Sequence, residues 1–166
     1  PNRNPLWDQA EAEHALKKAF GAERICWLGD GLLNDHTDGH VDNLARFVDK
    51  NTVVCPKVYG DDDPNAALYD KTASLLRDYG FEVVEIPSVG LVYDSLSGDI
   101  APASHMNLII GNKTIAVPTY GTGTGDEAVR ILQNLFPNHK VKGFSSITIL
   151  TGGGSFHCTT QQEPEL

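Results

Sequence analysis

Short β-rich runs, polar turns and helically spaced apolar residues follow one another along this chain in a repeated order. Residues 44–48 and 52–55 are two β-rich runs around a polar turn, which predicts a β-hairpin. A helix should follow, with its N-cap at Asp63 and its end at Gly80, because apolar side chains recur between them at helical spacing. Residues 81–86 then return to a strand pattern. The predicted unit is strand, strand, helix, strand.

The same order recurs further along the chain. Residues 106–110 and 114–117 predict a second hairpin, closed by a Gly-Asn turn. Thr124 and Glu127 match the capping-box pattern at the start of a second helix, and another strand begins at Val141. An order that returns in this way is typical of an architecture assembled from repeated supersecondary units.

The two ends of the chain resemble pieces of the same unit. Asp8 and Glu11 are spaced to cap a helix, which a strand over residues 25–28 should follow, and residues 156–160 resemble one opening strand. We therefore predict an α/β fold of about two complete ββαβ units plus flanking pieces, forming a single domain over residues 1–166 that belongs to something larger. The alternative is a compact two-unit domain with frayed ends.

Composition excludes some classes of protein. The 166 residues include no apolar run long enough to span a bilayer, and the N-terminus lacks both a signal segment and an initiator Met, which indicates processing or cleavage. A formal net charge of −9 with scattered basic residues argues against a nucleic-acid partner. An acidic protein can attract a cationic ligand, but acidic surfaces are common, so charge alone does not identify one.

Three cysteines, Cys26, Cys55 and Cys158, show no C-x-x-C spacing. An odd number of cysteines without a signal segment favours a reducing, cytoplasmic compartment and one reactive thiol. Cys26 and Cys55 lie in apolar runs typical of buried thiols, whereas Cys158 closely follows three consecutive glycines. Cys158 is therefore the candidate nucleophile.

Two polar segments carry the candidate chemistry. Residues 34–43 gather three carboxylates and two imidazoles just before the first hairpin, and residues 151–162 surround Cys158. On a strand, His40 and Asp42 would point to the same face and line one pocket. A histidine can protonate a leaving group and activate water beside a cysteine nucleophile, and an aspartate can accept paired N–H bonds from a guanidinium. These residue types alone still permit several hydrolases.

Four stretches of the chain resemble the agmatine deiminase family, which includes the bacterial peptidylarginine deiminase-like proteins. They are residues 2–5 (NRNP), 27–29 (WLG), 37–48 (TDGHVDNLARFV) and 152–162 (GGGSFHCTTQQ). The resemblance covers nearly the whole chain and implies part of a pentein-type α/β propeller, a five-fold pseudo-symmetric ring of ββαβ units. The chain would be the C-terminal half of such a protein. The N-terminal half, absent here, would supply further carboxylates and part of the substrate pocket.

The resemblance also implies a mechanism. Cys158 attacks the guanidinium carbon of agmatine, His40 protonates the departing ammonia, and water hydrolyses the covalent thiouronium to release N-carbamoylputrescine. Asp42 holds the guanidinium nitrogens, and no cofactor or metal is required. Asp38 is also placed to cap its own turn. Further candidate substrate contacts are Gly153, Gly154, Asp38 and Asn107.

Several alternatives stay open. Arginine or peptidyl arginine could replace agmatine, and an inactive half-propeller could serve as an interaction module, with the missing half or a second copy of the chain as partner. Residues 35–42 also resemble a carboxylate-histidine metal cluster, although His36 and His40 would share a face only on a helix. His36 either lines the pocket rim or is solvated. His157, next to Cys158 on the expected strand, should point away into packing.

Overall fold

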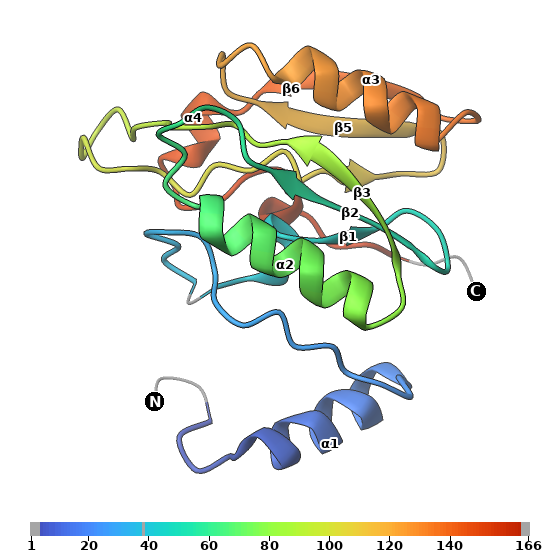
Figure 1. Cartoon of the computed structure of the whole chain (residues 1–166). Coiled ribbons are helices and arrows are strands. Elements are labelled where there is room, and N and C mark those ends of the chain that lie inside the picture. The colour runs from blue at the N-terminus through green and yellow to red at the C-terminus, as the bar shows by residue number, and fades with distance from the viewer. Residues whose placement is uncertain (1–3, 38, 164–166) are drawn as a thin grey trace.

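The structure is a computed structural model that describes residues 4–37 and 39–163. Figure 1 shows two α/β units stacked on one another, with the first helix lying apart below them. The N-terminal helix α1 (Gln9–Phe20) begins at the predicted capping box of Asp8 and Glu11 and ends at Gly21, whose φ of 64° suits a left-handed C-cap. None of its residues is buried, and the Phe20 side chain at its end is 79% exposed.

The first unit confirms the predicted hairpin and helix. Strand β1 (Arg46–Phe47) pairs antiparallel with β2 (Thr52–Lys57), and β2 pairs parallel with β3 (Glu82–Pro87). Helix α2 (Ala66–Asp78) makes the crossover and packs on β2 and β3. A parallel pair requires such a crossover, because its strands run in the same direction.

The second unit repeats this topology. Strand β4 (Ile109–Ile110) pairs antiparallel with β5 (Thr114–Thr119), and β5 pairs parallel with β6 (Lys140–Ser145). Helix α3 (Gly125–Leu135) connects β5 to β6 and contacts both strands. The two three-stranded sheets therefore share one strand order, and the mixed α/β class with two ββαβ units is confirmed.

The largest hydrophobic cluster joins the two units. Ile86 of β3 packs in the same cluster as Ile115 and Val117 of β5 and Leu132 of α3, and all four side chains are inaccessible to solvent. Helix α3 also contacts β3 directly. Burial of these side chains, worth roughly 1.5–3 kcal/mol each, fixes the relative position of the two hairpins that lead into the candidate site.

The N-caps predicted for α2 and α3 differ in detail. The N-cap of α2 is Asn65, not Asp63, and the Asp63 carboxylate accepts hydrogen bonds from the Asn65 amide and from the Ser88 hydroxyl, which tie the loop to the end of β3. Thr124 is the N-cap of α3 but makes no side-chain capping bond. Its hydroxyl instead pairs with Nε2 of the buried His105 at 3.0 Å.

The predicted strand over residues 25–28 is wrong. No strand pairs with this segment in the part of the chain that the structure describes. The Tyr79 hydroxyl hydrogen-bonds with both the amide and the carbonyl of Trp27, at 3.2 Å each, and so satisfies backbone groups that a neighbouring strand would otherwise pair. Within residues 4–37 and 39–163, no helix combines the length and apolar character needed to cross a membrane.

Candidate active site

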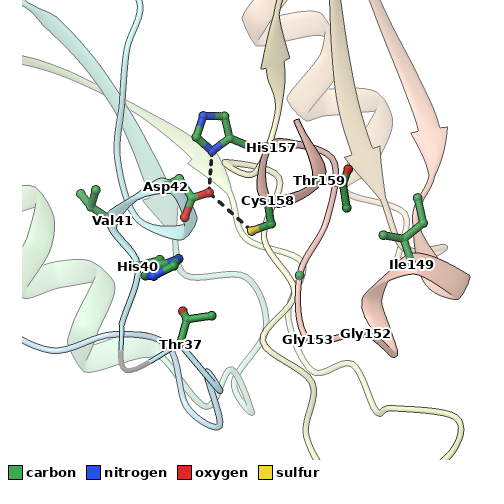
Figure 2. A pocket seen from close by; sticks show the side chains of 11 residues that line it. Thr37, His40, Val41, Asp42, Ile149, Gly152, Gly153, His157, Cys158 and Thr159 are labelled. Carbon is green, nitrogen blue, oxygen red and sulfur yellow. Dashed lines mark hydrogen bonds and ion pairs between the residues drawn. The ribbon is translucent and has the colours of Figure 1, made fainter. Parts of the chain in front are cut away.

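Both polar segments singled out in the sequence line one cavity of about 590 Å³. Thr37, His40 and Asp42 lie on one side, and the chain from Ile149 to Thr159 supplies the other (Figure 2). Among the predicted site residues, the cavity lining contains His40, Asp42, Gly153, Gly154 and Cys158. Asp38 lies outside the described residues.

His40 and Asp42 do not lie on a strand, and this prediction is wrong. Residues Val41–Asn43 form a turn of 3₁₀ helix with His40 as its N-cap. Three residues per turn place the Val41 side chain on the cavity wall as well, where it stays 59% exposed. The tight turn nevertheless brings His40 and Asp42 to the same cavity.

Asp35 holds the loop that leads into this turn. Its carboxylate accepts hydrogen bonds from the amide and hydroxyl of Thr37, at 2.9 and 2.5 Å, and from the Asn43 side chain. Burial acts to raise the pKa of Asp35, but these hydrogen bonds, with one from the His40 backbone, lower it more, so the pKa lies below its ordinary value. The ionised Asp35 carboxylate therefore holds the loop in place by accepting these hydrogen bonds.

Cys158 is solvent-exposed and lies in a second 3₁₀ turn, His157–Thr159, instead of the predicted strand. The amides of His157 and Cys158 donate to Oδ1 of Asn107 at 2.9 and 3.3 Å. A side-chain carbonyl therefore replaces the strand partner that sequence reasoning assumed. This arrangement fixes the backbone of the candidate nucleophile on the second ββαβ unit.

Asn107 is fully buried, so the structure places it behind the cavity wall and not in the cavity lining. Its Nδ2 lies 3.0 Å from the Cys158 sulfur, 2.9 Å from Oδ2 of Asp42 and 3.0 Å from Oδ1 of Asn43. The two backbone amides identify its oxygen, so the NH₂ group must face these three acceptors. Asn107 was expected to contact the substrate, but in the structure its side chain connects Cys158 to Asp42.

The two oxygens of Asp42 have different surroundings. Oδ2 is near three donors: Nδ2 of Asn107, Nδ1 of His157 at 2.6 Å, and the Cys158 sulfur at 3.6 Å. Oδ1 is buried and has no hydrogen-bond partner among the described residues. A buried carboxylate oxygen without a donor is costly, which points to a group that would supply one.

His157 was expected to point away from Cys158, and the structure contradicts this. Because the segment is a 3₁₀ turn and not a strand, successive side chains do not alternate, and the imidazole folds onto Asp42. The Asp42 and His157 side chains are only 12% and 28% exposed. Sequence spacing gave no signal for this contact, which joins residues 115 positions apart.

Arg46 links the two units beneath the site. Its Nη1 donates to the carbonyl oxygens of Met106 and Leu108, on either side of Asn107, at 3.2 and 2.7 Å. Burial lowers the pKa of Arg46, while the nearby Asp42 carboxylate opposes this shift. Arginine remains protonated in proteins, so Arg46 is a fixed cation that partly balances Asp42.

The glycines after Thr151 let the chain pass close to Cys158. A Cβ added to Gly154 would lie 2.9 Å from the Cys158 Cβ and 3.0 Å from its sulfur. Gly153 has a φ of 85°, which favours glycine, and its backbone lies against the exposed His36 ring. His36 itself lines a neighbouring cavity and not the one that contains Cys158.

The metal cluster weighed as an alternative does not assemble among the residues placed by the structure. No group of three or more His, Cys, Asp or Glu side chains within residues 4–37 and 39–163 is arranged to hold a metal ion. His36 lies in the neighbouring cavity, and the Asp35 carboxylate is engaged by Thr37 and Asn43.

An exposed cysteine, a carboxylate and two imidazoles thus line one cavity on a scaffold of ββαβ units. Residues 1–164 match the model of the Porphyromonas-type peptidyl-arginine deiminase family, and the chain belongs to that family. Its enzymes are hydrolases of guanidino C–N bonds. The resemblance seen in the sequence is thereby confirmed.

Similar proteins of known name and similar solved structures agree with this family assignment. A protein from Marinomonas sp. (strain MWYL1), named as an inferred agmatine deiminase, is 35% identical over 186 residues, covering 99% of this chain and 50% of its own length. A cysteine-to-serine variant of C. jejuni agmatine deiminase, solved with substrate bound, has a TM-score of 0.89 and 30% identity over 96% of this chain and 48% of its own. Agmatine deiminase of Enterococcus faecalis has a TM-score of 0.89 and 30% identity over 98% and 50%. The chain thus spans about half the length of the relatives it matches.

Proposed function

We propose that this chain carries the nucleophilic half of an agmatine deiminase-type active site, with Cys158 as nucleophile, His40 as acid and base, and Asp42 as the guanidinium acceptor. The supporting observation is the cluster around the Cys158 sulfur. An Asn107 N–H lies 3.0 Å and an Asp42 carboxylate oxygen 3.6 Å from it, in a cavity that His40 also lines. The completed enzyme converts agmatine and water to N-carbamoylputrescine and ammonia.

The chemistry follows from the charges around the sulfur. A carboxylate 3.6 Å from Cys158 repels a thiolate, whereas a guanidinium bound in the cavity beside both groups neutralises the carboxylate and favours the thiolate. A cationic substrate therefore activates its own nucleophile. The Asn107 N–H donates to the sulfur and further stabilises its negative charge.

The reaction then proceeds through two balanced steps. The Cys158 sulfur forms a bond to the guanidinium carbon, one terminal C–N bond breaks, and His40 supplies the proton with which the nitrogen leaves as ammonia. Water next attacks the thiouronium carbon and gives a proton to His40. The C–S bond then breaks, the second proton of this water passes to solvent, and the neutral ureido product leaves Cys158 as the thiolate that began the reaction.

The chain is proposed to be one half of a five-fold propeller of ββαβ units, in agreement with the length and TM-scores of its structural neighbours. In that arrangement a preceding half supplies the carboxylates that complete the guanidinium site. Agmatine is favoured because several relatives are named agmatine deiminases. Arginine and peptidyl arginine are tested beside it, since the family description names peptidyl arginine.

The test compares this chain with its Cys158→Ala variant, each alone and mixed with the N-terminal half of a matched relative. Ureido product and ammonia are measured with agmatine, arginine and an arginine peptide, and acid-quenched samples are analysed by mass spectrometry for a thiouronium on Cys158. We expect agmatine turnover, or at least the adduct, with the wild-type sequence and neither with Cys158→Ala. The proposal fails if no sample shows turnover or adduct, or if Cys158→Ala retains turnover.

A further inference from the structure

Asp42 is held by an imidazole that the proposed reaction does not use. Nδ1 of His157 lies 2.6 Å from Oδ2 of Asp42, the shortest contact that this carboxylate makes among the described residues. Figure 2 shows the His157 ring on one side of Asp42 and His40 on the other. The two histidines therefore have separate positions around one aspartate.

The direction of this hydrogen bond follows from the chemistry of its partners. An ionised carboxylate can only accept, so Nδ1 of His157 carries the proton and donates it to Oδ2. Both side chains are largely shielded from water, at 28% exposure for His157 and 12% for Asp42. Water therefore competes little for the two groups that form this charge-assisted hydrogen bond.

The backbone that carries the His157 ring is itself fixed by Asn107. The His157 amide donates to Oδ1 of Asn107 at 2.9 Å and also lies 3.2 Å from the Asn107 carbonyl oxygen. Nδ2 of the same asparagine donates to Oδ2 of Asp42 at 2.9 Å. Two rigid donors, Asn107 and His157, thus define the plane of the Asp42 carboxylate, while its Oδ1 has no protein donor in the described structure.

We infer that His157 is a positioning residue, which holds Oδ2 of Asp42 so that the carboxylate is oriented to accept an N–H of a bound guanidinium. This inference rests on the proposed function, because it assigns a role to the imidazole through the Asp42 that binds substrate. Without the His157 donor, only the Asn107 hydrogen bond restrains Oδ2, and the carboxylate rotates more freely about its Cβ–Cγ bond. Loss of a fixed orientation lowers recognition of a planar cation more than it lowers the reactivity of the sulfur itself.

The test uses two alkylating probes of similar size on this chain, so that it does not depend on turnover. 2-Chloroacetamidine is a planar cation with N–H groups on one side, whereas 2-chloroacetamide is neutral. The rate of Cys158 alkylation by each probe is measured by mass spectrometry at one pH, and the ratio of the two rates reports recognition of the cation. Changes in the sulfur alone affect both rates and largely cancel in the ratio.

Four variants separate the possible roles. Asp42→Asn should abolish the preference for the cation. His157→Gln places its amide where Nε2 of the imidazole was, and we expect the ratio to fall about tenfold. His157→Asn keeps an N–H donor near the Nδ1 position and should restore most of the preference. His14→Gln makes the same substitution on the exposed face of α1 and should leave the ratio unchanged.

The outcomes distinguish this inference from the proposal on which it rests. If Asp42→Asn leaves the ratio unchanged, the proposed function is contradicted. If Asp42→Asn abolishes the preference but His157→Gln does not alter it, only the role of His157 is overturned. Equal losses in His157→Gln and His157→Asn, in parallel with lowered melting temperatures, would also overturn it, because a merely structural role predicts that pattern.

Discussion

Nδ2 of Asn107 lies 3.0 Å from the sulfur of Cys158. Oδ1 of the same side chain accepts hydrogen bonds from the backbone amides of His157 and Cys158. One buried side chain therefore fixes both the backbone and the sulfur of the candidate nucleophile. It also reaches Asp42, so the nucleophile and the guanidinium acceptor share a single support. Disturbing this support should affect folding and reactivity together.

Replacing Asn107 with leucine should lower the free energy of unfolding by about 2–4 kcal/mol, because it removes the side-chain acceptor of the His157 and Cys158 amides and one hydrogen-bond donor to the buried Asp42 carboxylate. Urea denaturation followed by circular dichroism measures the change. The control is Asn134→Leu on the exposed face of α3, which should change stability by less than about 0.5 kcal/mol. Equal effects of the two substitutions would contradict the assigned network.

Replacing Gly154 with alanine should slow alkylation of Cys158 at least about tenfold, since the new Cβ would lie only 2.9 Å from the Cys158 Cβ and force the nucleophile to move. Iodoacetamide labelling followed by peptide mass spectrometry measures the rate. Gly152→Ala is the matched control, because its added Cβ comes no closer than 3.3 Å to Ile149. An unchanged rate in Gly154→Ala would show that the turn accommodates a side chain.

Cys55 should resist alkylation in the folded protein. Burial in β2, with a further contribution from the Glu85 carboxylate, raises the pKa of the Cys55 thiol to about 12, so almost no thiolate exists at pH 8. Labelling at pH 8 should modify the exposed Cys158 and leave Cys55 unmodified until denaturant is added. Rapid labelling of Cys55 in the native protein would contradict its burial.

His105 should make stability depend on pH in the mildly acidic range. Burial lowers the pKa of His105 below its ordinary value of about 6.5, although the bond from Nδ1 to the Pro118 carbonyl opposes the shift. Below that value the unfolded chain binds a proton that the folded chain excludes, so this contribution to stability is present above about pH 6.5 and is lost as the pH falls towards the folded pKa.

The midpoint of His105 is measured by NMR titration of its imidazole, beside denaturation curves at several pH values. We expect a midpoint below about 6.5 and a free energy of unfolding that decreases between about pH 7 and 5. A midpoint at or above the ordinary value would contradict a neutral, buried His105 that accepts from Thr124.

The sequence correctly predicted the helix and the hairpins whose determining residues lie close together along the chain. The capping box at Asp8 and the Gly21 C-cap define α1 correctly, because their hydrogen bonds join residues three to five apart. The hairpins at residues 44–55 and 106–117 were found for the same reason, since alternation and turn residues lie within each hairpin. Prediction failed at Asp63 and Thr124, whose side chains bond to the distant Ser88 and His105, while Asn65 is the N-cap of α2.

The sequence by itself determined the family, the ββαβ order and the residue types of the candidate site, because long motifs and short-range periodicity are properties of neighbouring residues. Only the tertiary structure decided how the site is held together. The strands expected at His40 and at Cys158 are 3₁₀ turns, and their geometry turns His157 onto Asp42. Asn107 supports both turns from a buried position on the other hairpin. These contacts join residues fifty or more positions apart, and packing of the two units, not spacing along the chain, brings them within hydrogen-bonding distance.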